Sequence, residues 1–146
     1  MASNIPFHEI ENLAAGQLSD YRSNNPGTCF SKPGFNIDIT AAYDVQDAVT
    51  KLRVGSGEHV IGYKVGCTGP GTRAQFGMDG PIRGTLFEDE ALTNGVYINP
   101  DEFCQLAIEG EMAIKVGENF GKGGAFSFFL LFLFPFIGYL ILGFGD

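Results

Sequence analysis

Basic residues are scarce in this chain of 146 residues, which contains nine Lys and Arg against 17 Asp and Glu. The resulting net charge of -8 argues against nucleic acid as a partner, because phosphate contacts need clustered Lys and Arg and the nine here are scattered. A chain of this length forms one domain with a modest core rather than two domains. We therefore expect one acidic folded domain with no nucleic-acid partner.

Cysteine and histidine are also few, and they show no recognisable pattern. Cys29, Cys67 and Cys104 lie far apart and have neither the spacing of a zinc site nor that of a disulfide framework. No Ser occupies a nucleophile elbow, and neither His has a paired His, Asp or Cys at a recognisable spacing. The residues before Pro6 include no basic and apolar run of a secretory signal. These absences predict reduced cysteines in a cytoplasmic domain and give no support to hydrolysis by a Ser or Cys triad.

Helical periodicity is present in the first third of the chain, and strand patterns follow it. Apolar residues at helical spacing predict helices over residues 6–21 and 40–54, the second with Thr40 as its N-cap. The glycine-rich residues 66–71 are expected to be loop, without the ending of a P-loop. Short runs rich in β-forming residues predict strands, at 59–65, 84–87, 95–98 and 107–116. Two helices followed by strands predict an α+β fold.

The most informative strand pattern is a pair of glutamates two residues apart. Side chains alternate along a strand, so Glu109 and Glu111 would share one face, with their Cα atoms about 6.6 Å apart. Two such carboxylates can converge on one ion, and oxygen-only ligands favour a hard cation such as Mg²⁺ or Mn²⁺. The same spacing also suits a half-exposed strand whose polar face is simply solvated.

A lysine between two glycines is the second candidate. Lys64 would share a strand face with Gly62 and Gly66, and glycine in a strand often marks the close approach of a ligand. A cation in such a hollow can hold a substrate carboxylate or take part in proton transfer. The alternative is a solvated surface lysine.

Four segments in this order resemble one enzyme family. They are residues 43–46 (Tyr-Asp-Val-Gln), 62–66 (Gly-Tyr-Lys-Val-Gly), 84–87 (Gly-Thr-Leu-Phe) and 109–111 (Glu-Gly-Glu). Together they resemble the 2-keto-4-pentenoate hydratase and oxalocrotonate decarboxylase family of the fumarylacetoacetase superfamily. The resemblance runs from the first helix to Gly117 and corresponds to the N-terminal half of a typical member.

The resemblance implies an incomplete mixed β-sheet after the N-terminal helices, and a metal-dependent lyase active on a 2-oxo acid. It implies that Glu109 and Glu111 are ligands of Mg²⁺ or Mn²⁺ and that Lys64 lines the substrate site. The parent reaction would be hydration of a 2-hydroxy-2,4-dienoate, in aromatic catabolism, to a 4-hydroxy-2-oxo acid. Decarboxylase, hydrolase or tautomerase chemistry on a similar oxo acid is the nearest alternative. Members of the family form homo-oligomers. Because this chain resembles only half of a member, the resemblance supports a homo-oligomer less strongly here.

Two departures from the family pattern affect these expectations. Ile82 and Arg83 stand where many relatives place an acidic or aromatic residue, which leaves the identity of the substrate open. The family's third acidic metal ligand lies downstream of the glutamate pair, and only Glu118 and Asp146 are available after Gly117. We therefore expect residues 1–122 to be a truncated hydratase-like domain without a complete metal shell.

The end of the chain differs sharply in composition from the rest. Residues 126–145 carry no charge and are dominated by Phe and Leu, which is long enough for a membrane-spanning helix, although Pro135 would kink it. Lys115 and Lys122 before this run favour a cytosolic N-terminal part. Residues 123–146 are thus expected to be either a C-terminal hydrophobic helix that anchors the protein in a membrane, or a segment translated from noncoding sequence. The anchored reading gives the second functional hypothesis, a noncatalytic interaction module.

Overall fold

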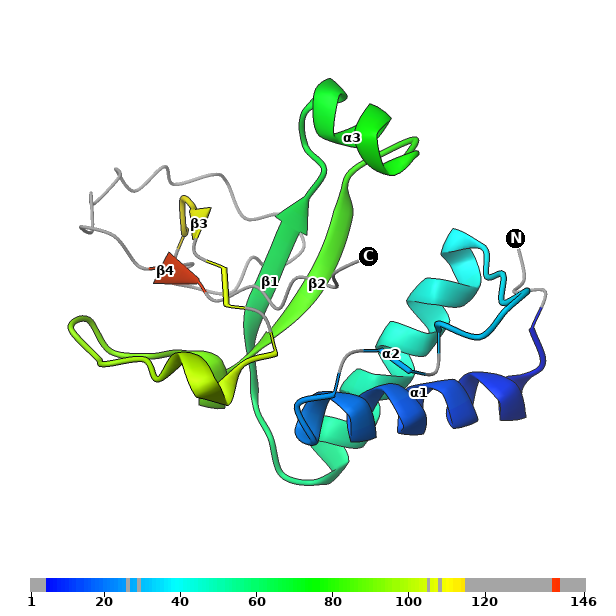
Figure 1. Ribbon diagram of the computed structural model, residues 1–146, viewed down its shortest axis with the longest axis horizontal. Coiled ribbons are helices and arrows are strands. Elements are labelled where there is room, and N and C mark those ends of the chain that lie inside the picture. The colour runs from blue at the N-terminus through cyan, green and yellow to red at the C-terminus, as the bar shows by residue number, and fades with distance from the viewer. Residues whose placement is uncertain are drawn as a thin grey trace, which may run out of the picture.

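The computed structural model of the protein describes residues 5–25, 27–28, 30–104, 106–107, 109–114 and 138–139. Within these residues, three α-helices occur together with antiparallel strand pairs. Two long helices lie side by side, and a pair of long strands stands next to them (Figure 1). The predicted α+β class is confirmed.

The first helix, α1, spans Phe7–Arg22 and begins after Pro6, whose backbone is extended. Three buried apolar residues, Ile10, Ala14 and Leu18, recur every four positions and therefore form one stripe along the helix. Ile10 and Ala14 of this stripe belong to a buried cluster shared with the second helix, and the helix predicted over residues 6–21 is confirmed.

The second helix, α2, spans Ile39–Gly55, as its apolar stripe predicted. Its N-cap is Asp38, whose carboxylate accepts a hydrogen bond from the Ala41 N–H at 2.7 Å. The prediction of Thr40 as the cap is wrong, because the chain is already extended at Asp38, two residues earlier, and this backbone brings the Asp38 carboxylate to the Ala41 N–H.

The core lies between these two helices. Ala14 and Ala41 are fully buried, and their small side chains let the helix backbones approach closely. Ile10 and Val45 complete the buried cluster. Partly buried apolar residues surround it: Ile5, Leu13, Phe30, Ile37, Ala48 and Val49.

The main strands, β1 (Val60–Gly66) and β2 (Ile82–Phe87), pair antiparallel, with an irregularity in register between Val60 and Gly62. The connection between them contains a third helix, α3 (Pro70–Phe76). The expectation that residues 66–71 are only loop is therefore wrong for residues 70 and 71, which begin α3. Proline suits the first turn of a helix, and Gly77, with a φ of 64°, provides the left-handed residue that ends α3.

Two of the other expected strands differ from the structure. Residues 95–98 form no strand, and Gly95 has a φ of 82°, which suits a turn. Of residues 107–116, the described strand is only β3, Glu109–Gly110. Two short 3-10 helices precede it, η1 (Glu88–Glu90) and η2 (Pro100–Glu102).

Most of the hydrophobic run at residues 126–145 lies outside the described residues. Its described part is Gly138–Tyr139, which form β4 and pair antiparallel with β3. The expected C-terminal helix is thus not supported, and at these two residues the backbone is a strand, which aromatic residues favour. Among helices that the structure describes, none has the length and apolar character needed to cross a membrane. Both strand pairs that the structure describes are antiparallel, so they include no parallel pair of the expected mixed sheet.

Candidate carboxylate-binding site

Lys64 lies near the middle of β1, on the same strand face as Gly62 and Gly66. The antiparallel register places Gly84 of β2 directly opposite it. A Cβ built on Gly84 would have no described atom within 4 Å. Because the Lys64 side chain is 23% exposed, its ammonium is partly shielded from water, with open space beside its stem.

Glu111 follows directly after β3 and meets Lys64 in space. Its Oε1 lies 3.3 Å from Lys64 Nζ, and its side chain is 39% exposed. This ion pair joins two residues that lie far apart in the sequence and were each predicted to be site residues. The structure thus places an acid and a base from different elements at one site.

Glu109 lies in β3, where it is paired with Tyr139 across the β3–β4 ladder. Glu109 and Glu111 are therefore two residues apart at the end of a short strand. Carboxylate oxygens are the ligands that a hard divalent cation prefers, so the donor chemistry of this pair fits such an ion. Within the described part of the chain, however, no three His, Cys, Asp or Glu residues gather into a potential metal cluster. The pair would thus leave further coordination positions to water, substrate or other groups.

Arg83 does not point toward this site. It pairs with Val65 in the register, so it lies on the strand face opposite to Lys64. Its guanidinium lies 3.1 Å from Asp47 Oδ1 and over the Tyr43 ring, 4.9 Å from the centroid. Arg83, which departs from the pattern of the resembled family, therefore contacts α2 and does not lie on the strand face of Lys64.

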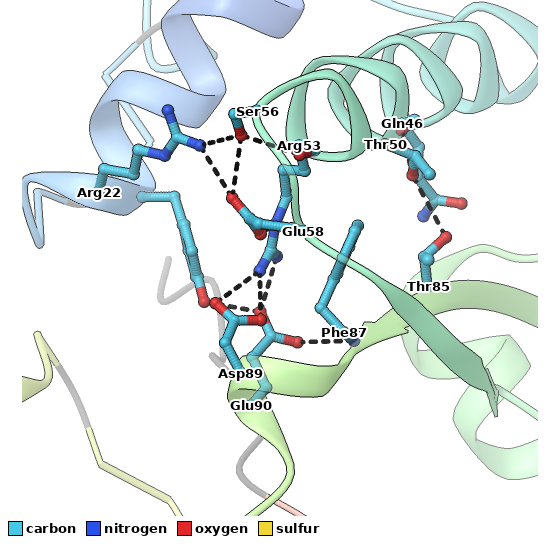
Figure 2. A network of polar contacts seen from close by, with 11 residues as sticks. Arg22, Gln46, Thr50, Arg53, Ser56, Glu58, Thr85, Phe87, Asp89 and Glu90 are labelled. Carbon is cyan, nitrogen blue, oxygen red and sulfur yellow. Dashed lines mark hydrogen bonds and ion pairs between the residues drawn. The ribbon is translucent and has the colours of Figure 1, made fainter.

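Two further hydrogen bonds join β2 to α2. Gln46 Nε2 donates to the Arg83 carbonyl at 3.0 Å, and Thr50 Oγ1 lies 3.3 Å from Thr85 Oγ1. The Thr50–Thr85 contact is visible in Figure 2. These contacts fix β2 against the helix, and β2 in turn fixes the register of the strand that carries Lys64.

A buried arginine at the end of α2, which the sequence pattern did not lead us to expect, organises an extended polar network among the described residues (Figure 2). The Arg53 side chain is only 7% exposed and hydrogen bonds Glu58 through Nε. Its Nη1 lies 2.7 Å from Glu90 Oε1, and its Nη2 lies 3.3 Å from Asp89 Oδ1. One guanidinium thus joins α2 to the residues that precede β1 and to those that follow β2.

Aromatic rings complete the surroundings of Arg53. Its guanidinium carbon lies 3.6 Å from the centroid of the Phe87 ring and 5.1 Å from that of Tyr21. The Tyr21 hydroxyl donates to Glu90 Oε1 at 2.7 Å. A signal for this network was present in the sequence, because Arg53 continues the four-residue spacing of Val45 and Val49 on the buried face of α2.

The network shifts the ionisation of its members. Burial, and then the hydrogen bond to Glu90, raise the pKa of Tyr21 above its ordinary range. Burial opposes the charged form of Glu58, but hydrogen bonds from Arg22 and Arg53 outweigh it, so the pKa of Glu58 lies below its usual value. Burial likewise lowers the pKa of Arg53, and its hydrogen bonds to Glu90 and Glu58 more than compensate, so the pKa is raised. The network therefore stabilises the charged forms of Glu58 and Arg53 and the neutral form of Tyr21.

The lysine and the glutamate that meet in this ion pair belong to an α+β domain, which is a broad class of protein. Comparisons with known proteins narrow this class, although no family model matches the chain. The chain is 35% identical over 82 residues to the TodF product hydratase of Pseudomonas putida. The aligned segment covers 56% of this chain and 31% of that protein. It is 33% identical over 82 residues to 2-keto-4-pentenoate hydratase 2 of Dechloromonas aromatica, with the same coverage. The chain spans about a third of the length of these curated relatives.

Solved structures with a similar fold come from the same group of enzymes. The 4-oxalocrotonate decarboxylase of Pseudomonas putida G7, complexed with calcium and acetate, superposes with a TM-score of 0.66 at 22% identity. That superposition covers 75% of this chain and 42% of the decarboxylase. Its complex with magnesium and adipate gives a TM-score of 0.52 at 23% identity, over 61% of this chain and 34% of the other. The chain is thus a partial match, over about half of its length in sequence, to the 2-keto-4-pentenoate hydratase and 4-oxalocrotonate decarboxylase family, as its motifs predicted.

Proposed function

We propose that residues 1–122 form a hydratase-like domain that binds a 2-oxo acid or 2-hydroxy-2,4-dienoate together with a divalent cation, and that residues 123–146 are a separate segment. The observation that carries this proposal is the 3.3 Å contact between Lys64 Nζ and Glu111 Oε1. In this contact, the lysine proposed to bind the substrate lies next to a carboxylate proposed to bind the metal. Named relatives that are hydratases, and a structural neighbour complexed with a divalent ion and a carboxylate, support it.

In this proposal the carboxylates of Glu109 and Glu111 hold Mg²⁺ or Mn²⁺, and Lys64 receives the carboxylate of the substrate. A bound divalent cation would stabilise negative charge on an enolate oxygen. The shielded Lys64 ammonium recognises a carboxylate by charge and donates hydrogen bonds to it. The open space beside Gly84 leaves room for the carbon chain of the ligand.

The proposed reaction adds water to a conjugated dienoate. The hydroxyl of water joins C4, and the enol proton and the remaining water proton end on C3 and C5, which leaves a ketone at C2. A group that can donate and accept a proton near the carboxylate end is needed for this, and the proposal gives that role to Lys64. No observation on the described residues favours the alternative of a membrane-anchored noncatalytic module.

Calorimetric titration of the full chain with Mn²⁺ tests the proposal. We expect saturable binding that is lost when Glu109 and Glu111 are both changed to Gln. A matched control changes Asp101→Asn and Glu102→Gln, which removes two exposed acids of η2 and should leave binding intact. Loss of the ultraviolet absorbance of 2-hydroxypenta-2,4-dienoate in the presence of Mn²⁺ would then report hydration. Binding that persists in the Glu109 and Glu111 variant would contradict the proposed metal ligands.

A further inference from the structure

We propose that two copies of this chain associate through β1, whose outer edge pairs antiparallel with the same edge of the second copy around a two-fold axis at Tyr63. This association needs neither the metal nor the substrate of the function proposed above. Three features of β1 carry it: the direction of its backbone groups, the apolar side chains along one face, and a register in which the strand fits a copy of itself.

The hydrogen bonds of Arg83 show which backbone groups of the β1–β2 pair point outward. The Arg83 N–H donates to the Tyr43 hydroxyl at 3.2 Å, and the Arg83 carbonyl accepts from Gln46 Nε2 at 3.0 Å. Both backbone groups thus point toward α2 and away from β1, which makes Arg83 and Val65 a non-hydrogen-bonded pair of the antiparallel ladder. Side chains of α2 therefore occupy the outer edge of β2 at this residue.

The same alternation leaves backbone groups of β1 facing outward. In a non-hydrogen-bonded pair, both residues direct their N–H and C=O groups away from the partner strand, and such pairs recur at every second residue. The backbone groups of Tyr63 and Val65 therefore point to the outer edge of β1. Among the described strands, only β2 pairs with β1, so no described strand satisfies these groups. An edge of this kind is a template for another extended chain.

Exposed apolar side chains follow the same edge. Ile61, Tyr63 and Val65 alternate with Gly62 and Lys64 and therefore share one face of β1. Each of these three apolar residues is more than half exposed. The matching face of β2 contacts α2 through the hydrogen bonds and the ion pair described above, whereas on β1 this face is open to water. A strand added to the edge of β1 would cover part of it.

The sequence of β1 fits itself in one antiparallel register. With Tyr63 on the two-fold axis, Val65 lies opposite Ile61 of the second copy, so the apolar residues of both copies form one continuous ladder. Lys64 then lies opposite Gly62 of the second copy and meets no like charge there. An axis two residues away on either side would place Tyr63 opposite a residue beyond the end of the strand. This fit favours a second copy over an unrelated extended segment.

Sedimentation equilibrium of the full-length chain tests the contact at Tyr63. Tyr63→Lys and Tyr63→Glu each place like charges directly opposite across the axis, so either variant alone should show half the mass of the wild-type dimer. An equimolar mixture of the two variants should restore the dimer mass, because opposite charges then face each other. The matched control is Tyr97→Lys, which changes another exposed tyrosine and should sediment as the wild type does.

Hydrogen exchange of the wild type provides a readout that needs no variant. The Tyr63 and Val65 amides should exchange more slowly as the protein concentration rises, because they become hydrogen bonded only in the dimer. A wild type that stays monomeric, or amide exchange that does not depend on concentration, would overturn the proposal. A dimer that persists in both Tyr63 variants, or a mixture of them that stays monomeric, would overturn it as well.

Discussion

Replacing Arg53 by methionine should cause the largest loss of stability of any single substitution in the polar network. The side chain is 7% exposed and hydrogen bonds three acids, so its removal leaves Glu58, Asp89 and Glu90 close together without their shared cation. Breaking a buried ion pair by removing one partner costs about 3–5 kcal/mol. Asp89 and Glu90 are 59% and 33% exposed and regain water, which reduces that cost.

Methionine also recovers part of the packing against Phe87, where the guanidinium now stacks at 3.6 Å. We therefore expect the free energy of unfolding to fall by about 2–3 kcal/mol, a large share of the 5–15 kcal/mol typical of a domain. Urea denaturation followed by far-ultraviolet circular dichroism measures this change.

Arg83→Met is the matched control, because Arg83 also pairs with an acid and stacks on a tyrosine but is 43% exposed. Its loss should cost only about 0.2–1 kcal/mol. Adding Glu90→Gln to Arg53→Met should restore part of the stability, since one of the stranded charges is removed. A change below about 1 kcal/mol for Arg53→Met, or one equal to that of Arg83→Met, would refute the view that burial makes this network strong.

Two further predictions concern acid stability and the helix cap. Because hydrogen bonds from Arg22 and Arg53 hold the pKa of Glu58 below its usual value, the stability it contributes is present above the unfolded pKa of about 4.3 and is lost as the pH falls through the folded pKa. Glu58→Gln should flatten the fall in unfolding free energy below about pH 4, and an unchanged acid limb in urea titrations would count against this role. Asp38→Ala should cost about 1 kcal/mol through loss of the α2 cap, whereas Thr40→Ala should cost clearly less, and the reverse order in thermal unfolding would show that the cap is misassigned.

The regular elements could be predicted because local pattern decides them. The buried positions of α1 recur every four residues, and β1 and β2 are short runs of β-forming residues between glycines and turns. The ends of elements were less predictable, since Asp38 and Thr40 are both good caps and only the path of the preceding chain selects between them. The helix α3 was missed because its glycines masked the proline start and the glycine end that define it.

The sequence indicated the residues of the candidate site, whose role stays a prediction, but it did not indicate their geometry. Lys64 and Glu111 carry chemistry that their spacing and neighbours indicate, yet their contact depends on how β3 is placed against β1. The position of Gly84 opposite Lys64 depends on strand register, which a single sequence does not give. Arg53 was missed because charged residues are usually exposed, and its burial becomes favourable only when distant acids and rings surround it.

The alternation along β2 makes two neighbouring residues independent targets for protein engineering. Arg83 faces the helices and Gly84 faces the lysine, although they are adjacent in the chain. Side chains added at residue 84 would reshape the proposed ligand space, and no described atom lies within 4 Å of a Cβ there. If the proposed site is right, a library at residue 84 would change the preference for a ligand, while one at residue 83 would change the contacts that join β2 to α2.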